Sequence, residues 1–303
     1  MIVTSIIVLT KNEAKNIGPC LDAIYAQKDV GAFEVIVVDS SSTDETLQVV
    51  RRFPVRVEQI PAESFHHART RNVAAALARG EFLVYLAADA FPASTNWLGS
   101  LLANFSDPAV AAVYGRHLPK PGSTSERRDA LDVVYGDRRL VKDPSCGAES
   151  GYRYYHFSTV NAAIRRCVWQ ATPFPEGIKV FEDLGIAKRI LDGGGKIVYE
   201  PQAAVYHSHN HTVTGLFKRY FDAGVVWNQL GIWNDQTRDS MLRDMGRLLR
   251  KKFRRSEGNG AGRAVHASVS QDLAKAVGLF MGLHERYIPL VIKQKISAFR
   301  LFG

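Results

Sequence analysis

The sequence lacks long hydrophobic runs: no window of about 18 residues is both apolar and uncharged, so no membrane-spanning helix is predicted. Cysteine is also scarce. The three cysteines, Cys20, Cys146 and Cys167, are odd in number and show no metal-ligand spacing, which predicts reduced thiols in a cytosolic compartment. The first residues, MIVTSIIVLT, have neither the basic start nor the small-residue cleavage site of a signal peptide, so we expect them to form a strand.

Residues 1–211 lack a net charge, because they hold 23 basic and 23 acidic residues. The excess of +9 comes from residues 212–303, which contain 16 basic and 7 acidic residues. Basic residues interleaved with Phe, Leu and Tyr, as around KKFRR at 251–255, are typical of helices that lie on an anionic membrane surface. A solvated helix and packing against a second subunit remain alternatives. Nucleic acid is not an expected partner, because no recognised nucleic-acid module or base-stacking array accompanies the charge.

Neither GxGxxG nor GxxxxGK[ST] follows the first predicted strand, which excludes a dinucleotide fingerprint and a P-loop. Strand and helix signals nevertheless alternate through the first half. This alternation predicts an α/β fold with a mostly parallel, Rossmann-like sheet sandwiched by helices, followed by a basic helical C-terminal extension. Strands are predicted at 3–9, 35–39, 55–60, 82–86, 109–114, 158–164 and 196–199. Helices are predicted at 14–27, from the SSSTDET segment to about residue 53, and at 67–79, 97–105, 182–191, 212–233 and 271–301.

Candidate binding residues follow the predicted strands, because ligands of such sheets collect at the carboxyl ends of the strands. Asp39 ends the second strand, too early to cap a helix, so we expect it to bind a ligand. In the following SSSTD, Ser42 and Thr43 are expected to cap the next helix. A lone acid, Asp89, ends the apolar run FLVYLAAD. Arg69 and Arg71 open a helix, where basic side chains oppose the helix dipole and favour an anionic ligand.

Two further patterns carry candidate chemistry. In FEDLGIAKRIL, Asp183 shares the apolar face of a predicted helix at its start, which suits an acid that points into a cleft. Glu182 aligns with Gly185 and Arg189 and is expected nearer solvent. In VYHSHNH, His207, His209 and His211 alternate, which suggests metal ligation. We expect one of them to join Asp89 on a divalent ion and His209 and His211 to be polar surface residues.

Taken in order, six segments resemble the family-2 glycosyltransferases of the GT-A fold, and among them the bacterial rhamnosyltransferases. The resemblance covers about residues 1–230. It rests on SIIVLTKNE, VIVVDSSSTDET, FHHARTRNVAAALARGEFLVYLAADAFP, NAAIRRCVW, FPEGIKVFEDLGIAKRIL and VYEPQAAVYHSHNH. It implies a glycosyltransferase domain over 1–211, with a nucleotide-binding half at 1–115 and an acceptor and catalytic half at 116–211. An amphipathic, basic helical region then follows at 212–303.

The resemblance also implies roles for individual residues. Asp183 is the general base of an inverting transfer. Asp89 and His207 hold a divalent cation, Mg²⁺ or Mn²⁺, although the family motif has an additional acid where this chain has Ala87. The residues implied in nucleotide-sugar binding are Thr10, Asn12, Glu13, Asp39, Ser41, Arg71, Asn72 and Asp89.

The implied reaction moves a sugar, L-rhamnose from dTDP-L-rhamnose being the first expectation, to a glycan or lipid-linked acceptor in cell-envelope polysaccharide synthesis. A UDP- or GDP-sugar donor is the alternative, as is a catalytically inactive nucleotide-sugar-binding or membrane adaptor protein, which the missing acid favours. The expected location is the cytoplasm, including the cytoplasmic face of the inner membrane.

Overall fold

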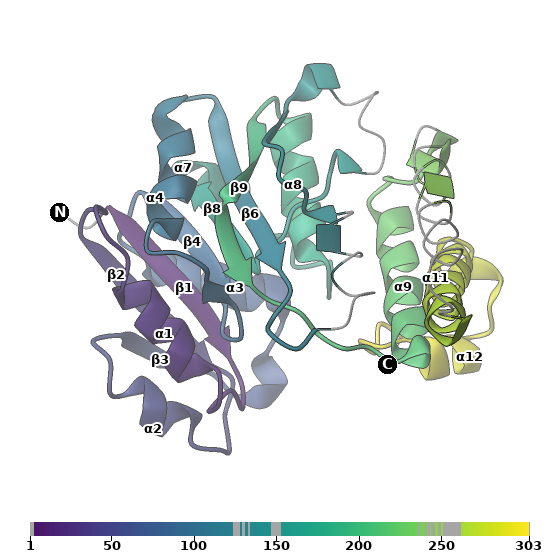
Figure 1. The fold of residues 1–303 in the computed structure, drawn as a ribbon, viewed down its shortest axis with the longest axis horizontal. Helices are drawn as coiled ribbons and strands as arrows, with labels where there is room; N and C mark the ends of the chain where they lie inside the picture. The colour runs from purple at the N-terminus through teal and green to yellow at the C-terminus, as the bar shows by residue number, and fades with distance from the viewer. Residues whose placement is uncertain are drawn as a thin grey trace. The chain divides into compact units, whose positions relative to one another are not determined.

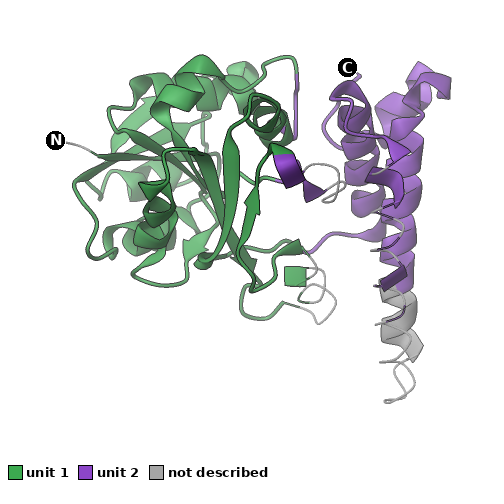
Figure 2. Cartoon of the chain, turned by 90° about the horizontal axis from the view of Figure 1, so that it is seen from above, with its two compact units in different colours: residues 1–144, 157–177, 182–209 green, residues 145–156, 178–181, 210–303 purple. Residues whose placement is uncertain are grey.

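The protein is described by a computed structural model, which covers residues 3–123, 134–146, 153–235 and 262–302, with isolated positions in the intervening stretches. The chain divides into two compact units (Figure 2). Unit 1 contains residues 1–144, 157–177 and 182–209, and unit 2 contains residues 145–156, 178–181 and 210–303.

A mixed sheet forms the centre of unit 1 (Figure 1), and the described residues contribute nine strands to it. They are β1 (Thr4–Thr10), β2 (Phe33–Asp39), β3 (Arg56–Gln59), β4 (Phe82–Ala87), β5 (Phe91–Pro92), β6 (Val110–Leu118), β7 (Leu140–Lys142), β8 (Asn161–Arg165) and β9 (Lys196–Tyr206). The order is β3-β2-β1-β4-β8-β6-β9-β5, with β7 also paired to β9. The pairings give β1, β2, β3, β4, β6 and β9 one direction and β5, β7 and β8 the other.

The central strands read as continuous apolar runs because both faces of the sheet are covered. Ile6 and Val8 of β1 share a core cluster with Ile17 and Leu21 of α1. Tyr85 of β4 points to the other face, where its ring packs edge-on against Phe174 at 5.3 Å. The helices of unit 1 are α1 (Ile17–Tyr25), α2 (Thr46–Val50), α3 (His67–Leu77), α4 (Trp97–Leu102), α7 (Arg166–Ala171) and α8 (Glu182–Asp192). The α/β fold with helices on both sides of the sheet is thus confirmed.

Unit 2 contains α9 (Val213–Gln229), α11 (Gly262–Leu283) and α12 (Leu290–Ile296). The backbones of α9 and α11 approach so closely that a Cβ atom at Gly282 would lie 2.0 Å from the carbonyl oxygen of Phe221. The buried carboxylate of Asp222 accepts hydrogen bonds from the N–H groups of Ala298 and Phe299 at 2.8 and 2.9 Å. Residues 210–230 and the chain's last residues therefore belong to one packed body.

The predicted helix over 271–301 is wrong as a single element, because α11 ends at Leu283 and α12 begins at Leu290. Pro289 is the residue immediately before α12. Because proline has no backbone N–H, it is tolerated at the start of a helix but interrupts a helix in its interior. The basic KKFRR segment at 251–255 lies outside the described residues.

Candidate active site

The directions of the strands bring the candidate residues to one edge of the sheet. Because β1, β2, β4, β6 and β9 run the same way, their carboxyl ends meet there. Thr10 pairs with Asp39 at the ends of β1 and β2, Asp89 follows β4, and His207 follows β9. In an α/β sheet this edge is the usual place of a ligand site.

The loops after β1 and β2 are joined by side-chain hydrogen bonds. The side-chain oxygen of Asn12 accepts from the N–H of Thr43 at 2.8 Å, and the N–H of Asn12 donates to Ser42 Oγ at 2.8 Å. Asp39 is fully buried and accepts from both the N–H and the hydroxyl of Ser42. Asn12 and Ser41 have φ values of 56° and 57°, a strained left-handed conformation that is common at binding sites.

One expectation for this loop pair is wrong, and Asp39 shows a contact that was not expected. Ser42 and Thr43 do not cap the next helix, because α2 begins only at Thr46. Asp39 does have a local role, since its carboxylate closes a turn onto Ser42. Asp39 nevertheless lies at the strand end, in the same pair of loops as Thr10, Asn12, Glu13 and Ser41. Among the described residues, the buried hydroxyls of Thr10 and Ser40 have no hydrogen-bond partner.

Asp89 lies in a cluster with two histidines. Its carboxylate oxygens are 3.6 Å from His207 Nε2 and 3.4 Å from His209 Nε2, and the two ring nitrogens are 3.0 Å apart. Lys120, after β6, places its Nζ 3.2 Å from Asp89 Oδ2. Burial opposes ionisation of Asp89, but the charges of His207, His209 and Lys120 hold its pKa below the usual value. The acid is therefore ionised at neutral pH.

The donor set of this cluster fits a divalent metal ion. One ligand atom each from Asp89, His207 and His209 lies within 4.8 Å of the others, so all three can reach a common ion. A carboxylate with two imidazoles is a combination that suits Mn²⁺ or a later transition metal better than Mg²⁺, which prefers oxygen ligands.

Two adjacent acids, Glu182 and Asp183, begin α8. Glu182 is buried and forms an ion pair with Arg71 Nη1 at 2.6 Å. Asp183 accepts from the N–H of Leu184 at 2.9 Å. Burial raises the pKa of Asp183 to about 7; the Glu182 charge adds to the rise, and Arg71 and the N–H groups of Leu184 and Thr159 oppose it. Thr159 precedes β8, which is antiparallel to β4, so Asp183 lies at the same edge of the sheet as Asp89. A carboxyl with this pKa can take up a proton near neutral pH.

The contacts of Arg71, Asn72 and Arg69 are with the protein. Arg71 pairs with Glu182. The Asn72 amide donates to the Phe174 carbonyl, and its oxygen accepts from Trp169 Nε1 and the Phe174 N–H. Arg69 pairs with Glu176 at 3.2 Å on the surface. Asn72 thus anchors the segment that precedes α8. Contact of Arg71 and Asn72 with the nucleotide stays a prediction.

Three residues of this edge were not among the predicted site residues. His209 was expected at the surface, although its i+2 spacing from His207 was a usable signal. Glu182 was expected nearer solvent than Asp183 but is 4% exposed. The sequence around Lys120 does not predict its contact with Asp89, because this contact depends on the order of the strands.

The loops after β1 and β2, the acid–histidine cluster and a partly buried carboxyl of raised pKa lie at one edge of the sheet, an arrangement expected of a glycosyltransferase with the GT-A fold. Residues 5–169 match the family model described as Glycosyl transferase family 2. Since this match covers more than half of the chain, the protein belongs to that family.

Two relatives are O-antigen chain rhamnosyltransferases. WbaN of Salmonella anatum is 38% identical over 63% of this chain and 62% of its own length. RfbN of Salmonella typhimurium is 33% identical over 73% of this chain and 71% of its own. A solved structure, the mannosyltransferase PcManGT from Pyrobaculum calidifontis in complex with GDP-Man and Mn²⁺, aligns with a TM-score of 0.58 at 22% identity, covering 97% of this chain and 76% of that one. This likeness shows the shared fold.

Proposed function

We propose that the protein transfers L-rhamnose from dTDP-L-rhamnose to a hydroxyl group of a glycan or lipid-linked acceptor in cell-envelope polysaccharide synthesis. The observation that carries this proposal is the meeting of Asp39, Asp89 and Asp183 at one edge of the sheet. The two O-antigen rhamnosyltransferase relatives support rhamnose as the sugar. The alternative donor is a UDP- or GDP-sugar, since PcManGT was solved with GDP-Man.

Asp39 is proposed to recognise the pyrimidine base, with Thr10, Asn12, Glu13 and Ser41 around the base and ribose. The unpartnered hydroxyls of Thr10 and Ser40 support this, because buried hydroxyls normally find a hydrogen-bond partner. Uracil and thymine present the same hydrogen-bonding edge, so this surface alone suits either base.

Asp183 is proposed as the general base. Its ionised carboxylate takes the proton of the acceptor hydroxyl as that oxygen bonds to the anomeric carbon. The bond between this carbon and the donor phosphate oxygen breaks, and the nucleoside diphosphate leaves with the electron pair. One base without a covalent nucleophile gives inversion at the anomeric carbon. Arg71 pairs with Glu182 and so limits the negative charge beside Asp183.

Asp89, His207 and His209 are proposed to hold a divalent cation, Mn²⁺ in preference to Mg²⁺. When bound, the ion neutralises charge that develops on the leaving diphosphate. Support comes from the convergence of the three side chains and from the Mn²⁺ in the PcManGT structure.

The proposal is tested by incubating the protein with Mn²⁺ and dTDP-L-rhamnose, UDP-glucose or GDP-mannose side by side, with a lipid-linked glycan as acceptor. We expect release of dTDP above that of UDP and GDP, and a product whose anomeric configuration, read by NMR, is inverted. Faster release of UDP or GDP would replace the donor assignment. Retention of configuration would remove Asp183 from its role.

We further propose that unit 2 binds an anionic membrane surface, at the cytoplasmic face where a lipid-linked acceptor is presented. None of the helices in the described residues combines the length and apolarity needed to cross a bilayer, so the proposal concerns the surface. Leu273, Val277 and Phe280 of α11 stand at i, i+4 and i+7 and are 62%, 41% and 62% exposed. The 16 basic residues of 212–303 would attract anionic head groups.

This membrane proposal is tested by flotation of the full chain with vesicles of phosphatidylglycerol and phosphatidylcholine, against phosphatidylcholine alone. We expect flotation only with the anionic lipid, and its loss in the double variant L273E/F280E. The matched control is V73E, which changes an exposed valine of unit 1. Equal flotation of L273E/F280E and the native chain would refute the assignment of this surface.

A further inference from the structure

Lys120 is held in the acid–histidine cluster by more than one contact. Its Nζ lies 3.2 Å from Asp89 Oδ2 and 5.0 Å from the centroid of the Phe91 ring. Its N–H donates to Ser208 Oγ at 3.1 Å. Ser208 stands between His207 and His209, so the loop after β6 and the histidine segment after β9 are joined at this point. The Lys120 side chain is 24% exposed, so it is not sealed off from solvent.

The charge of this cluster differs from that of a site with two carboxylates. Ala87 and Ala88 precede Asp89, so the cluster contains one carboxylate, and Lys120 adds a positive charge beside it. Within a few ångströms and partly buried, an ammonium group repels a divalent ion and attracts a diphosphate. It also occupies Oδ2 of Asp89, one of the two oxygens that a metal ion would use.

We infer that Lys120 binds the nucleotide-sugar, its ammonium group contacting the diphosphate; this inference rests on the proposed function. The ammonium group supplies positive charge to the leaving group and competes with the divalent ion for Asp89. Nucleoside diphosphate binding is therefore retained in part when the metal is removed. A lysine that only orients Asp89 would affect metal binding but not binding of the nucleotide in a chelator.

The test uses Lys120→Met, which keeps the length of the side chain over Phe91, and Lys120→Arg, which keeps the charge. Binding of dTDP, UDP and GDP is measured by calorimetry in EDTA and then with Mn²⁺. In EDTA we expect Lys120→Met to bind the preferred diphosphate at least about tenfold more weakly than the native chain. Lys120→Arg should bind within a few-fold of the native chain. Lys196→Met is the matched control, since Lys196 also pairs with a carboxylate, that of Asp107 at 3.1 Å.

Binding of Mn²⁺ alone, followed by electron paramagnetic resonance, gives a second readout that does not depend on activity. Removal of the competing ammonium should tighten Mn²⁺ binding at least about threefold in Lys120→Met. Equal nucleotide affinity of Lys120→Met and the native chain in EDTA would overturn the inference, while the proposed function would stand if Mn²⁺ restored binding. If none of the three diphosphates binds the native chain even with Mn²⁺, the proposed function fails, and this inference with it.

Discussion

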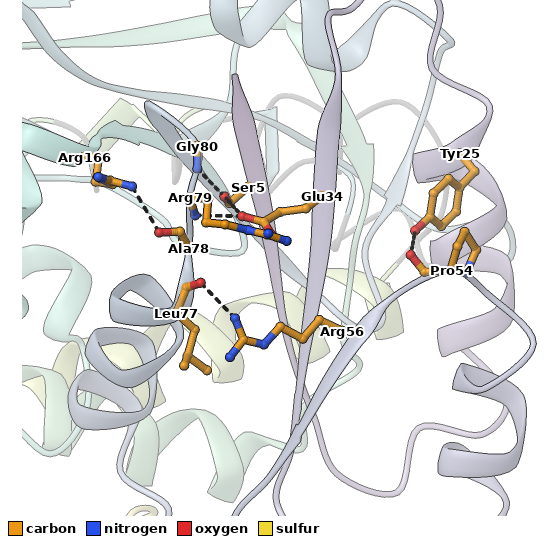
Figure 3. Close-up of polar contacts among 10 residues, drawn as sticks. All are labelled: Ser5, Tyr25, Glu34, Pro54, Arg56, Leu77, Ala78, Arg79, Gly80 and Arg166. Carbon is orange, nitrogen blue, oxygen red and sulfur yellow. Dashed lines mark hydrogen bonds and ion pairs between the residues drawn. The ribbon is translucent and has the colours of Figure 1, made fainter. Parts of the chain in front are cut away.

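Strand β2 carries one acid near each end, and the two acids have opposite surroundings. Glu34, near its start, accepts hydrogen bonds from Ser5 Oγ at 2.7 Å, from the N–H of Arg79 at 2.7 Å and from the Arg79 guanidinium (Figure 3). Ser5 Oγ in turn accepts from the N–H of Gly80. The carboxylate of Asp39, at the end of β2, accepts hydrogen bonds from the N–H and the hydroxyl of Ser42, and the nearby buried hydroxyls of Thr10 and Ser40 have no partner in the described residues.

The same difference distinguishes the two edges of the sheet, where the strands begin and where they end. At the edge where the parallel strands begin, the backbone is closely packed, because a Cβ atom at Gly80 would lie 2.6 Å from the backbone N of Ser5. Burial opposes ionisation of Glu34, but its hydrogen bonds lower its pKa overall. At the carboxyl edge, Asn12 and Ser41 are strained and the pKa of Asp183 is raised. We therefore infer that the first edge stabilises the fold and that the second serves binding at some cost in stability.

The largest test of this comparison is Asp183→Asn, which keeps the shape of the side chain and removes the base. We expect the rate of nucleoside diphosphate release with acceptor to fall at least about 100-fold. Nucleotide affinity, measured by calorimetry, should stay within a few-fold, because Asp183 is proposed to act on the acceptor and its carboxylate accepts from Leu184 and Thr159. Asp192→Asn, at the far end of α8, is the control and should retain full turnover. Near-native turnover of Asp183→Asn would remove its assignment as the base.

The pH dependence of the rate should be the next largest effect. A base works when ionised, so kcat/KM should rise with pH, by about tenfold per unit below the pKa, and level off above it. With the pKa of Asp183 at about 7, the midpoint should fall near neutral pH. Arg71 lowers this pKa, so in Arg71→Met the midpoint should move to higher pH. An unchanged midpoint in that variant would mean that another group controls the profile.

The sequence predicts most of the carboxyl edge, because the apolar runs that define β2 and β4 end at Asp39 and Asp89. The sequence does not predict which side chains from different elements come into contact. Arg71 reaches Glu182, and Lys120 reaches Asp89, through the packing of elements that are far apart in the sequence. No local pattern reports this packing. The sequence predicts ligand binding by Asp39 but not its hydrogen bonds to Ser42, because that turn depends on backbone geometry.

A smaller effect should distinguish two histidines of one segment. His209 lies 3.4 Å from Asp89, and His211 is not part of the cluster of potential ligands. We expect His209→Ala to weaken Mn²⁺ binding at least about tenfold, as loss of one of three protein ligands should. His211→Ala should bind Mn²⁺ like the native chain. Both are read by electron paramagnetic resonance, and equal losses in the two variants would contradict the assignment of His209.

The smallest effect on activity, and the sharpest contrast, is expected from Glu34→Ala at the opposite edge. It leaves Ser5 and the Arg79 N–H without their acceptor, so the free energy of unfolding should fall by about 1–3 kcal/mol, while kcat and KM stay unchanged. Glu81→Ala is the control: Glu81 is 65% exposed and pairs with Arg165 at 3.6 Å, so its loss should cost less than about 1 kcal/mol.

The pH dependence of stability isolates the charge of Glu34 from its packing. Because the pKa of Glu34 is lower in the folded chain than its usual value of 4.5, its contribution is complete above that value and is lost as the pH falls through the folded-state pKa. Denaturant unfolding of the native chain and of Glu34→Ala should therefore differ most at neutral pH, and the difference should shrink as the pH falls through the folded-state pKa of Glu34. A difference independent of pH would assign the stabilisation to the aliphatic part of the side chain. A fall in turnover would mean that the two edges of the sheet are not separate in purpose.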